Sequence, residues 1–220
     1  QGLVGLQNRL RDPATRASLE RGEAAGADLI IEAVPEKLEL KLEATAAKGN
    51  KVVQTLLEMV GVPYTGSGRL GSAMAMDKDI SKRLFRDAGV PTADWVMAPA
   101  ARDRIERDFG YPVVVKPSKQ GSTVGLSVVK ASKEYEPAVA LARQYDDEVM
   151  IERFVPGREL TVGILEGRAL AVGEIIPRHE IFDYECKYTP GMSQEIFPAG
   201  LPAAVGAECQ RLSRLAHEAL

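Results

Sequence analysis

Cysteine and histidine are scarce in this sequence. Its 220 residues include two cysteines, Cys186 and Cys209, and two histidines, His179 and His217. No Cys-x-x-Cys or His-Glu-x-x-His spacing occurs, which argues against a structural zinc site of the usual kind. So few cysteines fit a reducing compartment, and we expect a cytoplasmic location. A chain of this length can bury a core without disulfides.

An excess of basic residues and long apolar runs are absent too. The 28 Lys and Arg against 31 Asp and Glu give a formal net charge of -3, whereas nucleic-acid binding needs a basic face. No apolar run approaches the roughly 20 residues of a membrane-spanning helix. Residues 1–4 lack the basic start of a signal peptide. We therefore expect no nucleic-acid partner and no membrane span.

The periodicity of apolar residues predicts a mixed α and β protein. Helices are expected over residues 36–47, 52–60, 77–88, 131–145 and 203–220. Strands are expected over residues 28–34, 95–97, 113–116, 126–129, 149–152, 160–165 and 169–175. Residues 63–71 are rich in turn formers. The start without Met and the end on a helix indicate a fragment.

Three of these helices have a predicted inward face. The helix after Asp77, which is the expected N-cap, should bury Ile80, Leu84, Phe85 and Ala88. The helix over residues 52–60 should place Val53, Leu56, Leu57 and Val60 on one face. The last helix should turn Val205, Leu212, Leu215 and Ala219 inward.

A lysine stands at the end of a buried strand. Three valines precede Lys116, and Pro117 ends the ladder. Burial of an ammonium group there is costly unless an anion meets it, so Lys116 is a candidate phosphate partner. The alternative is a lysine whose head reaches solvent.

A glycine-serine loop follows at once. The segment Gly121-Ser122-Thr123-Val124-Gly125 lies between two predicted strands, and its amides and hydroxyls could bind phosphate oxygens. It lacks the Gly-Lys-Ser/Thr of a P-loop. Taken alone, the loop is better explained as an ordinary glycine hairpin.

Two carboxylates flank a short connector. Glu152 ends one strand, Glu159 opens the next, and residues 153–158 between them can offer unpaired backbone groups to an adenine edge. The alternative is a pair of surface glutamates beside a turn.

Residues 181–188 form a dense polar and aromatic segment. A long loop of this content is more often functional than structural, and Lys187 is a second candidate phosphate partner. We interpret Cys186 as a small filler with no histidine or base beside it.

One glycine motif is misleading. Residues 66–71 match G-x-G-x-x-G, but a proline-containing helix exit stands where a dinucleotide site needs a strand. We expect no dinucleotide site here.

Together, five strings carry a resemblance to a known family. They are LLEMVGVPYTGSG, AMDKDISKRLF, GYPVVVKPSKQGSTVGLS, VMIERFVPGRELTVGIL and EIFDYECKYTPG. From about residue 52 onward, the chain resembles a bacterial D-alanine–D-alanine ligase of the ATP-grasp superfamily. The resemblance implies an α+β ATP-grasp fold in which two lobes grip ATP. It implies a partial α/β region over residues 1–76, a central lobe over 77–155 and a truncated C-terminal lobe over 156–220.

The resemblance also implies roles for individual residues. Lys78, Lys116 and Lys187 would contact the ATP phosphates, and Ser122 would close over the phosphates and the substrate. Adenine would be bound by Glu152, by the backbone of Arg153 and Val155, and by two walls, Phe154 and Ile181. Glu159 would hold the ribose. Tyr188 would favour D-alanine as acceptor over D-lactate. Ser122, Lys187 and Tyr188 would act in catalysis.

The implied reaction joins two D-alanines for peptidoglycan precursors. ATP would phosphorylate one D-alanine to an acyl phosphate, and the amine of the second would displace the phosphate. The resemblance implies Mg²⁺ or Mn²⁺ with ligands beyond residue 220, no metal ligand within the chain, and room for a homodimer. The family's amine-positioning Glu has no counterpart, because residues 44–51 read ATAAKGNK. We therefore expect little or no turnover from these 220 residues.

Residues 26–43 carry a second resemblance. The string beginning GADLIIEAV is similar to part of the NAD domain of 3-hydroxyacyl-CoA dehydrogenases, but the glycine motif follows it instead of preceding it. Three alternatives to the ligase stay open: another ATP-grasp carboxylate–amine ligase, an inactive module that only binds nucleotide, and, last, a dehydrogenase.

Overall fold

A computed structural model describes residues 51–64, 66–100 and 102–220. The chain divides into two compact units, one ending at Ala73 and one comprising Met74–Leu220, and each is described by itself. The strand expected over residues 28–34, the helix over 36–47 and the dehydrogenase-like segment lie outside the described residues. No helix in the described ranges is long and apolar enough to cross a membrane.

The described part of the first unit centres on helix α4 (Lys51–Met59). Leu57 is buried, as predicted, but Val60 is exposed because the helix ends before it. The Glu58 carboxylate accepts a hydrogen bond of 2.6 Å from the Tyr64 hydroxyl and one of 3.1 Å from the Arg69 N–H. Arg69 opens helix α5 (Arg69–Met76), which takes up the end of the segment predicted to be turns. Glu58 therefore fixes the connection between the two helices.

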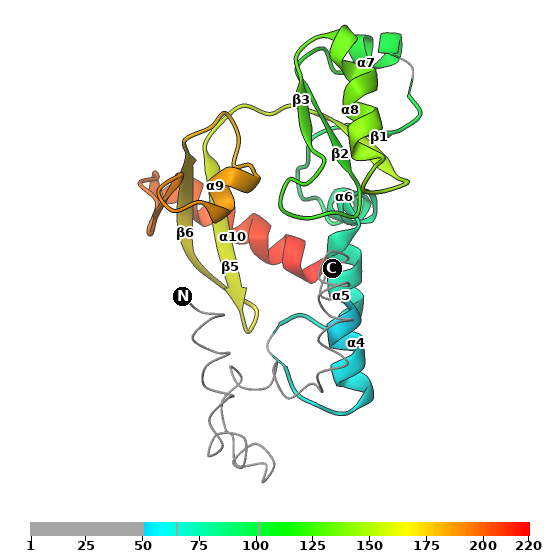
Figure 1. Ribbon diagram of the computed structural model, residues 1–220. Coiled ribbons are helices and arrows are strands. Elements are labelled where there is room, and N and C mark those ends of the chain that lie inside the picture. The colour runs from blue at the N-terminus through cyan, green and yellow to red at the C-terminus, as the bar shows by residue number, and fades with distance from the viewer. Residues whose placement is uncertain (1–50, 65, 101) are drawn as a thin grey trace. The chain divides into compact units, whose positions relative to one another are not determined.

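The second unit contains a four-stranded antiparallel sheet (Figure 1). Its strands are β1 (Trp95–Met97), β2 (Val113–Pro117), β3 (Ser127–Val129) and β4 (Val149–Arg153), in the order β1-β4-β2-β3. All four predicted strands are confirmed to within one residue at each end. A register of Val114 opposite Glu152 places β4 beside β2.

One face of this sheet carries the hydrophobic core. Helices α7 (Arg102–Asp108) and α8 (Tyr135–Ala142), the latter preceded by the 3-10 helix η2 (Ser132–Glu134), supply its other half. The core is formed by Ile105, Val113, Val115, Val129, Tyr135, Ala138, Val139, Ala142, Val149 and Ile151. Because side chains alternate along a strand, β2 and β4 send Lys116 and Glu152 to the opposite face.

A second antiparallel sheet has the order β5-β6-β7. Its strands are β5 (Glu159–Leu165), β6 (Arg168–Pro177) and β7 (Ser193–Ile196). Glu166 and Gly167, with φ of 50° and 73°, join β5 to β6 in the left-handed conformation that two-residue hairpin turns require. Helix α10 (Ala203–Glu218) packs against β5 and β6.

The predicted inward faces of two further helices are also wrong in part. Val205 lies in the first turn of α10 and is exposed, whereas Leu212 and Leu215 are half-buried. In helix α6 (Lys78–Asp87), Asp77 is the N-cap, as predicted. Ile80 and Ala88 of the expected apolar stripe are exposed, however, and Ser81 and Lys82 are buried instead. The inward face of α6 is polar because it meets the ionic site described next.

Candidate functional site

Four charged side chains meet on the face of the first sheet that is opposite the core. Lys116 of β2 and Lys82 of α6 both form ion pairs with the Glu152 carboxylate of β4, one with each oxygen. Lys116 and Glu152 are diagonal neighbours, since Met150 lies opposite Lys116 and Val114 opposite Glu152. Strand pairing alone therefore brings the predicted Lys116 and Glu152 together.

Lys78 approaches the same place from the first turn of α6. Its ammonium group donates to the Ser118 carbonyl at 3.0 Å and to the Gln120 carbonyl. Burial, followed by repulsion from the nearby Lys116, lowers the pKa of Lys78 to about 8. The carbonyl partners carry no full negative charge, so Lys78 is an under-compensated cation.

Glu152 is the counter-ion of this cluster. Its side chain is 14% exposed, and those of Lys82 and Lys116 are 9% and 17% exposed. Burial would raise the pKa of Glu152, but the ammonium groups of Lys116 and Lys82 outweigh it, and the pKa lies below its ordinary value. The carboxylate is thus ionised at neutral pH.

Lys82 was not among the site residues predicted from the sequence. Its ammonium group also donates to the Thr92 hydroxyl at 2.5 Å and lies 5.0 Å from the centre of the Trp95 ring. A signal was available, because residues four apart lie on one face of a helix and Lys82 follows Lys78 by four. The assumption that the inward face of α6 is apolar concealed it.

The glycine-serine loop is shaped by its backbone. Ser122 and Thr123 have φ of 51° and 60°, which is uncommon for residues with a side chain. At Gly125, with φ of 69°, an added Cβ would lie 2.7 Å from the Tyr145 ring, so only glycine fits. The Ser122 hydroxyl lies 2.6 Å from the Tyr188 hydroxyl. Two predicted catalytic residues are therefore in direct contact.

The predicted adenine hinge is only partly free. The N–H of Arg153 donates to the Asp94 carbonyl at 2.9 Å, and its guanidinium group donates to the carbonyls of Asp108 and Phe109. That N–H is therefore not available to a base. Phe154 is half-buried and Val155 is 67% exposed, so the residues after β4 are accessible.

The predicted ribose and base residues lie at the second sheet. Glu159 opens β5, and its carboxylate accepts a hydrogen bond of 3.1 Å from the N–H of Phe182. Ile181, which precedes Phe182 in the sequence, is half-buried. The forked ion pair of Arg158 with Glu174 of β6, at 2.6 Å for each hydrogen bond, fixes the residue before Glu159.

The segment that carries Lys187 is a short helix, α9 (Tyr184–Tyr188). The Lys187 ammonium group lies 5.3 Å from the centre of the Phe182 ring. Within the described residues, no hydrogen bond or ion pair joins Lys187 to the Lys116 cluster. Tyr188 is 60% exposed, and its ring centre lies 4.6 Å from that of Tyr184, with the two ring planes tilted by 49°.

One interpretation of this segment is wrong. Cys186 is buried, as expected of a filler, but a histidine and a carboxylate do stand beside it, namely His179 and Asp183. These residues are seven and three positions earlier in the chain. A turn after β6 returns the chain on itself, and sequence spacing alone did not reveal that turn.

Comparison with known proteins decides the family. The family described as "D-ala D-ala ligase C-terminus" matches residues 84–220. The chain belongs to the D-alanine–D-alanine ligase family. This confirms the resemblance found in the motifs, and the ATP-grasp fold follows from it.

Curated relatives and solved structures agree with this membership. D-alanine–D-alanine ligases of Geobacter sulfurreducens and Citrifermentans bemidjiense are 46% and 44% identical over 76% and 90% of the chain. The crystal structure of the Bacillus anthracis D-alanine–D-alanine ligase is similar over 84% of this chain and 66% of that one, with a TM-score of 0.68 and 32% identity. The Enterococcus faecalis D-Ala:D-Ser ligase VanG has a TM-score of 0.66 and 30% identity over 80% of this chain and 53% of that one. The present chain spans 54% of the length of the Geobacter sulfurreducens relative and 66% of that of the Citrifermentans bemidjiense relative.

Proposed function

We propose that this protein is an ATP-dependent ligase that joins two D-alanines through an acyl phosphate, for peptidoglycan precursors. The observation that carries the proposal is the convergence of Lys78 and Lys116 on one buried face, beside Glu152. Family membership over residues 84–220 supports the choice of reaction.

The cationic face would bind the ATP phosphates. Lys116 can turn from Glu152 to a phosphate oxygen, and Lys78 can exchange its two carbonyl partners for another. A polyphosphate would supply the negative charge that Lys78 lacks, and charge-assisted hydrogen bonds are about twice as strong as neutral ones.

Lys82 would remain as the cationic partner of Glu152 during this exchange. When Lys116 turns to a phosphate, the buried carboxylate keeps Lys82 and need not be left without a partner, which would be costly. Lys82 is the less exposed of the two lysines and has two further contacts, to Thr92 and Trp95. We therefore assign the permanent ion pair to Lys82 and the exchangeable one to Lys116.

The nucleoside would lie along the connector between the two sheets. The accessible backbone of Val155 would bind adenine, and Phe154 and Ile181 would pack on the base. Arg153 could contribute only its carbonyl there, because its N–H is occupied. Glu159 would accept from the ribose hydroxyls, with one carboxylate oxygen already oriented by Phe182.

Catalysis would rest on positioning and on neutralising charge. The Ser122–Tyr188 contact would close the glycine-serine loop over the reacting D-alanine carboxylate, and Lys187 would reach the transferred phosphoryl group from α9. The amine of the second D-alanine would then attack the acyl carbon, and phosphate would leave. Tyr188 would favour D-alanine over D-lactate as acceptor.

No group of three or more carboxylates close enough to hold one magnesium ion stands among the described residues. Among them, one group of three or more His, Cys, Asp and Glu side chains is close enough to hold an ion, and it contains an imidazole and a thiol. Magnesium prefers oxygen ligands in octahedral geometry. No step of the proposed reaction is therefore assigned to a metal held by these residues.

Nucleotide binding is the first test of the proposal. The 220-residue chain should bind a fluorescent ATP analogue that unlabelled ATP displaces and that GTP displaces less well. If the analogue did not bind, the proposed ATP site would be wrong. Phosphate release with ATP, Mg²⁺ and D-alanine would separate a ligase from the second candidate, a module that only binds nucleotide. The sequence ATAAKGNK at residues 44–51, which lacks the amine-positioning Glu, favours that candidate.

The affinity for ATP should depend on pH through Lys78. Its pKa of about 8 in the free protein means that the ammonium form, which phosphates prefer, is lost as pH rises through 8. Above this pKa the affinity should fall by up to about tenfold per pH unit. Isothermal titration between about pH 7.5 and 9.5 would measure it. In Lys78→Arg the guanidinium stays charged, and the same slope in that variant would contradict the assignment.

A further inference from the structure

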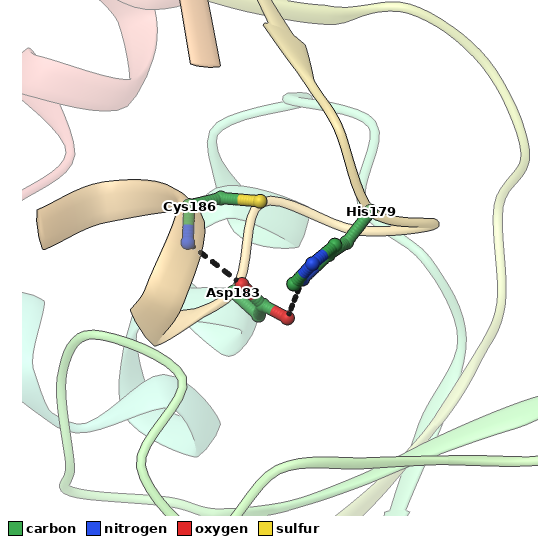
Figure 2. A group of neighbouring side chains, drawn as sticks. All are labelled: His179, Asp183 and Cys186. Atoms are coloured by element: carbon green, nitrogen blue, oxygen red, sulfur yellow. Dashed lines mark hydrogen bonds and ion pairs between the residues drawn. The ribbon is translucent and has the colours of Figure 1, made fainter. Parts of the chain in front are cut away.

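Three side chains with different metal-binding atoms meet where the chain turns from β6 into α9 (Figure 2). Nδ1 of His179 lies 2.7 Å from Oδ2 of Asp183, and the donor atoms of His179, Asp183 and Cys186 all lie within 4.8 Å of one another. The reaction proposed above uses none of these residues.

Local structure explains why they meet. Asp183 is the N-cap of α9, and its Oδ1 accepts a hydrogen bond of 2.9 Å from the N–H of Cys186. This bond brings the third residue of the helix over the capping carboxylate. His179 follows the end of β6 and returns to the other oxygen. The carboxylate is thus held from both sides.

Hydrogen bonds to the Asp183 carboxylate hold this cluster together. The Asp183 carboxylate accepts hydrogen bonds from Nδ1 of His179, from the N–H of Cys186 and from the Cys186 side chain. Two side chains therefore present hydrogens to one carboxylate. A divalent cation can replace these hydrogens. Sγ would lose its proton to solvent, the imidazole proton would move from Nδ1 to the exposed Nε2, and Sγ, Nδ1 and Oδ2 would bind the ion while Oδ1 keeps its bond to the Cys186 N–H.

The donor set selects the ion. A thiolate and an imidazole with one carboxylate suit Zn²⁺ and Co²⁺ and are poor ligands for Mg²⁺ or Ca²⁺. Zinc–ligand distances of about 2.0–2.3 Å place its ligand atoms roughly 3–4 Å apart, so small side-chain rotations suffice here. Thiolate and carboxylate together balance the two charges of the ion, which lowers the cost of a site whose cysteine is buried.

We propose that His179, Asp183 and Cys186 form a binding site for a zinc-class transition metal ion, with a fourth position left for water or another ligand. The bound ion would fasten the turn after β6 to α9, the helix that carries Lys187 and Tyr188. This inference does not rest on the proposed function, because it concerns the metal alone.

Cobalt provides a direct probe. The untagged 220-residue chain, freed of metal by a chelator, would be titrated with Co²⁺ in the absence of nucleotide. One equivalent should produce a thiolate-to-cobalt charge-transfer band together with the visible bands of a tetrahedral ion, and Zn²⁺ should abolish both. Failure of the wild-type chain to give the charge-transfer band would overturn the proposal.

Matched variants would locate the site. Cys186→Ser should lose the charge-transfer band, whereas Cys209→Ser, which removes the other free thiol, should keep it. His179→Gln should weaken binding by about tenfold or more, since even outer-shell changes cost 10- to 100-fold. Asp183→Ser keeps a capping side chain but removes the carboxylate, so it should keep the far-ultraviolet circular dichroism and bind cobalt more weakly. An unchanged cobalt affinity in Asp183→Ser, or loss of the band in Cys209→Ser, would also overturn the proposal.

Discussion

Replacement of Lys116 by alanine should weaken ATP binding by roughly 10- to 100-fold, because a hydrogen bond to a charged group contributes about 1.5–3 kcal/mol. The ammonium group sits on a buried face, where solvent screens a phosphate charge only weakly. Its loss leaves Glu152 with Lys82, so the fold should persist. Competition titration with a fluorescent ATP analogue would measure the change.

Lys133 provides the control for this prediction. It is an exposed lysine in the 3-10 helix η2, which precedes α8 and belongs to the layer that covers the core face of the sheet. Lys133→Ala removes the same charge from the chain and should leave the affinity within about twofold, as expected for a screened surface charge. If both variants lost ATP affinity equally, Lys116 would act only through the overall charge of the protein, and its assignment to the ATP site would be wrong.

Replacement of Lys82 by methionine should lower the free energy of unfolding by about 2–3 kcal/mol. Methionine keeps most of the side-chain volume, but the Glu152 carboxylate then loses one of its two cationic partners at a buried position. The Thr92 hydroxyl and the Trp95 ring also lose their contact with the ammonium group. Urea denaturation followed by circular dichroism would give the difference.

Two comparisons show whether the cost comes from the carboxylate. Lys130→Met breaks an ion pair with Glu180 in which both side chains are more than half exposed, and exposed pairs contribute at most about 1 kcal/mol. In a background of Glu152→Gln, Lys82→Met should cost clearly less than in the wild type, because no buried charge is then left under-compensated. If it costs the same in both backgrounds, packing and not charge explains the effect.

Much of the sheet that carries Lys116 could be predicted from the sequence. Val113-Val114-Val115 and Val149-Met150-Ile151 are continuous apolar runs that predict buried strands. Strand pairing then fixes which side chains share a face. The position of Lys116 at the end of a strand was therefore informative. The ion-pair partner of Lys116, Glu152, could not be predicted, because the two residues are 36 positions apart and meet only through the pairing of β2 with β4.

Other parts could not be predicted because their sequences carry weak local signals. Helix α7 is predominantly charged, with Ile105 as its one buried residue, so it has no apolar stripe. Strand β7 is short, and most of its residues are polar. Helix α9 has five residues and depends on the Asp183 cap. In α6, the buried face is set by charges on another element, and helix periodicity alone could not reveal it.

The two ends of the glycine-serine loop are held by different kinds of force. Its exit is a steric lock, because Gly125 fits against Tyr145 with no room for a side chain. Its entry is tethered by the Lys78 ammonium group, through the carbonyls of Ser118 and Gln120. A ligand that draws Lys78 away would untie the entry and leave the exit in place. The loop would then be held at Gly125 and by the contact of Ser122 with Tyr188, and its entry would become free to move when the ligand binds.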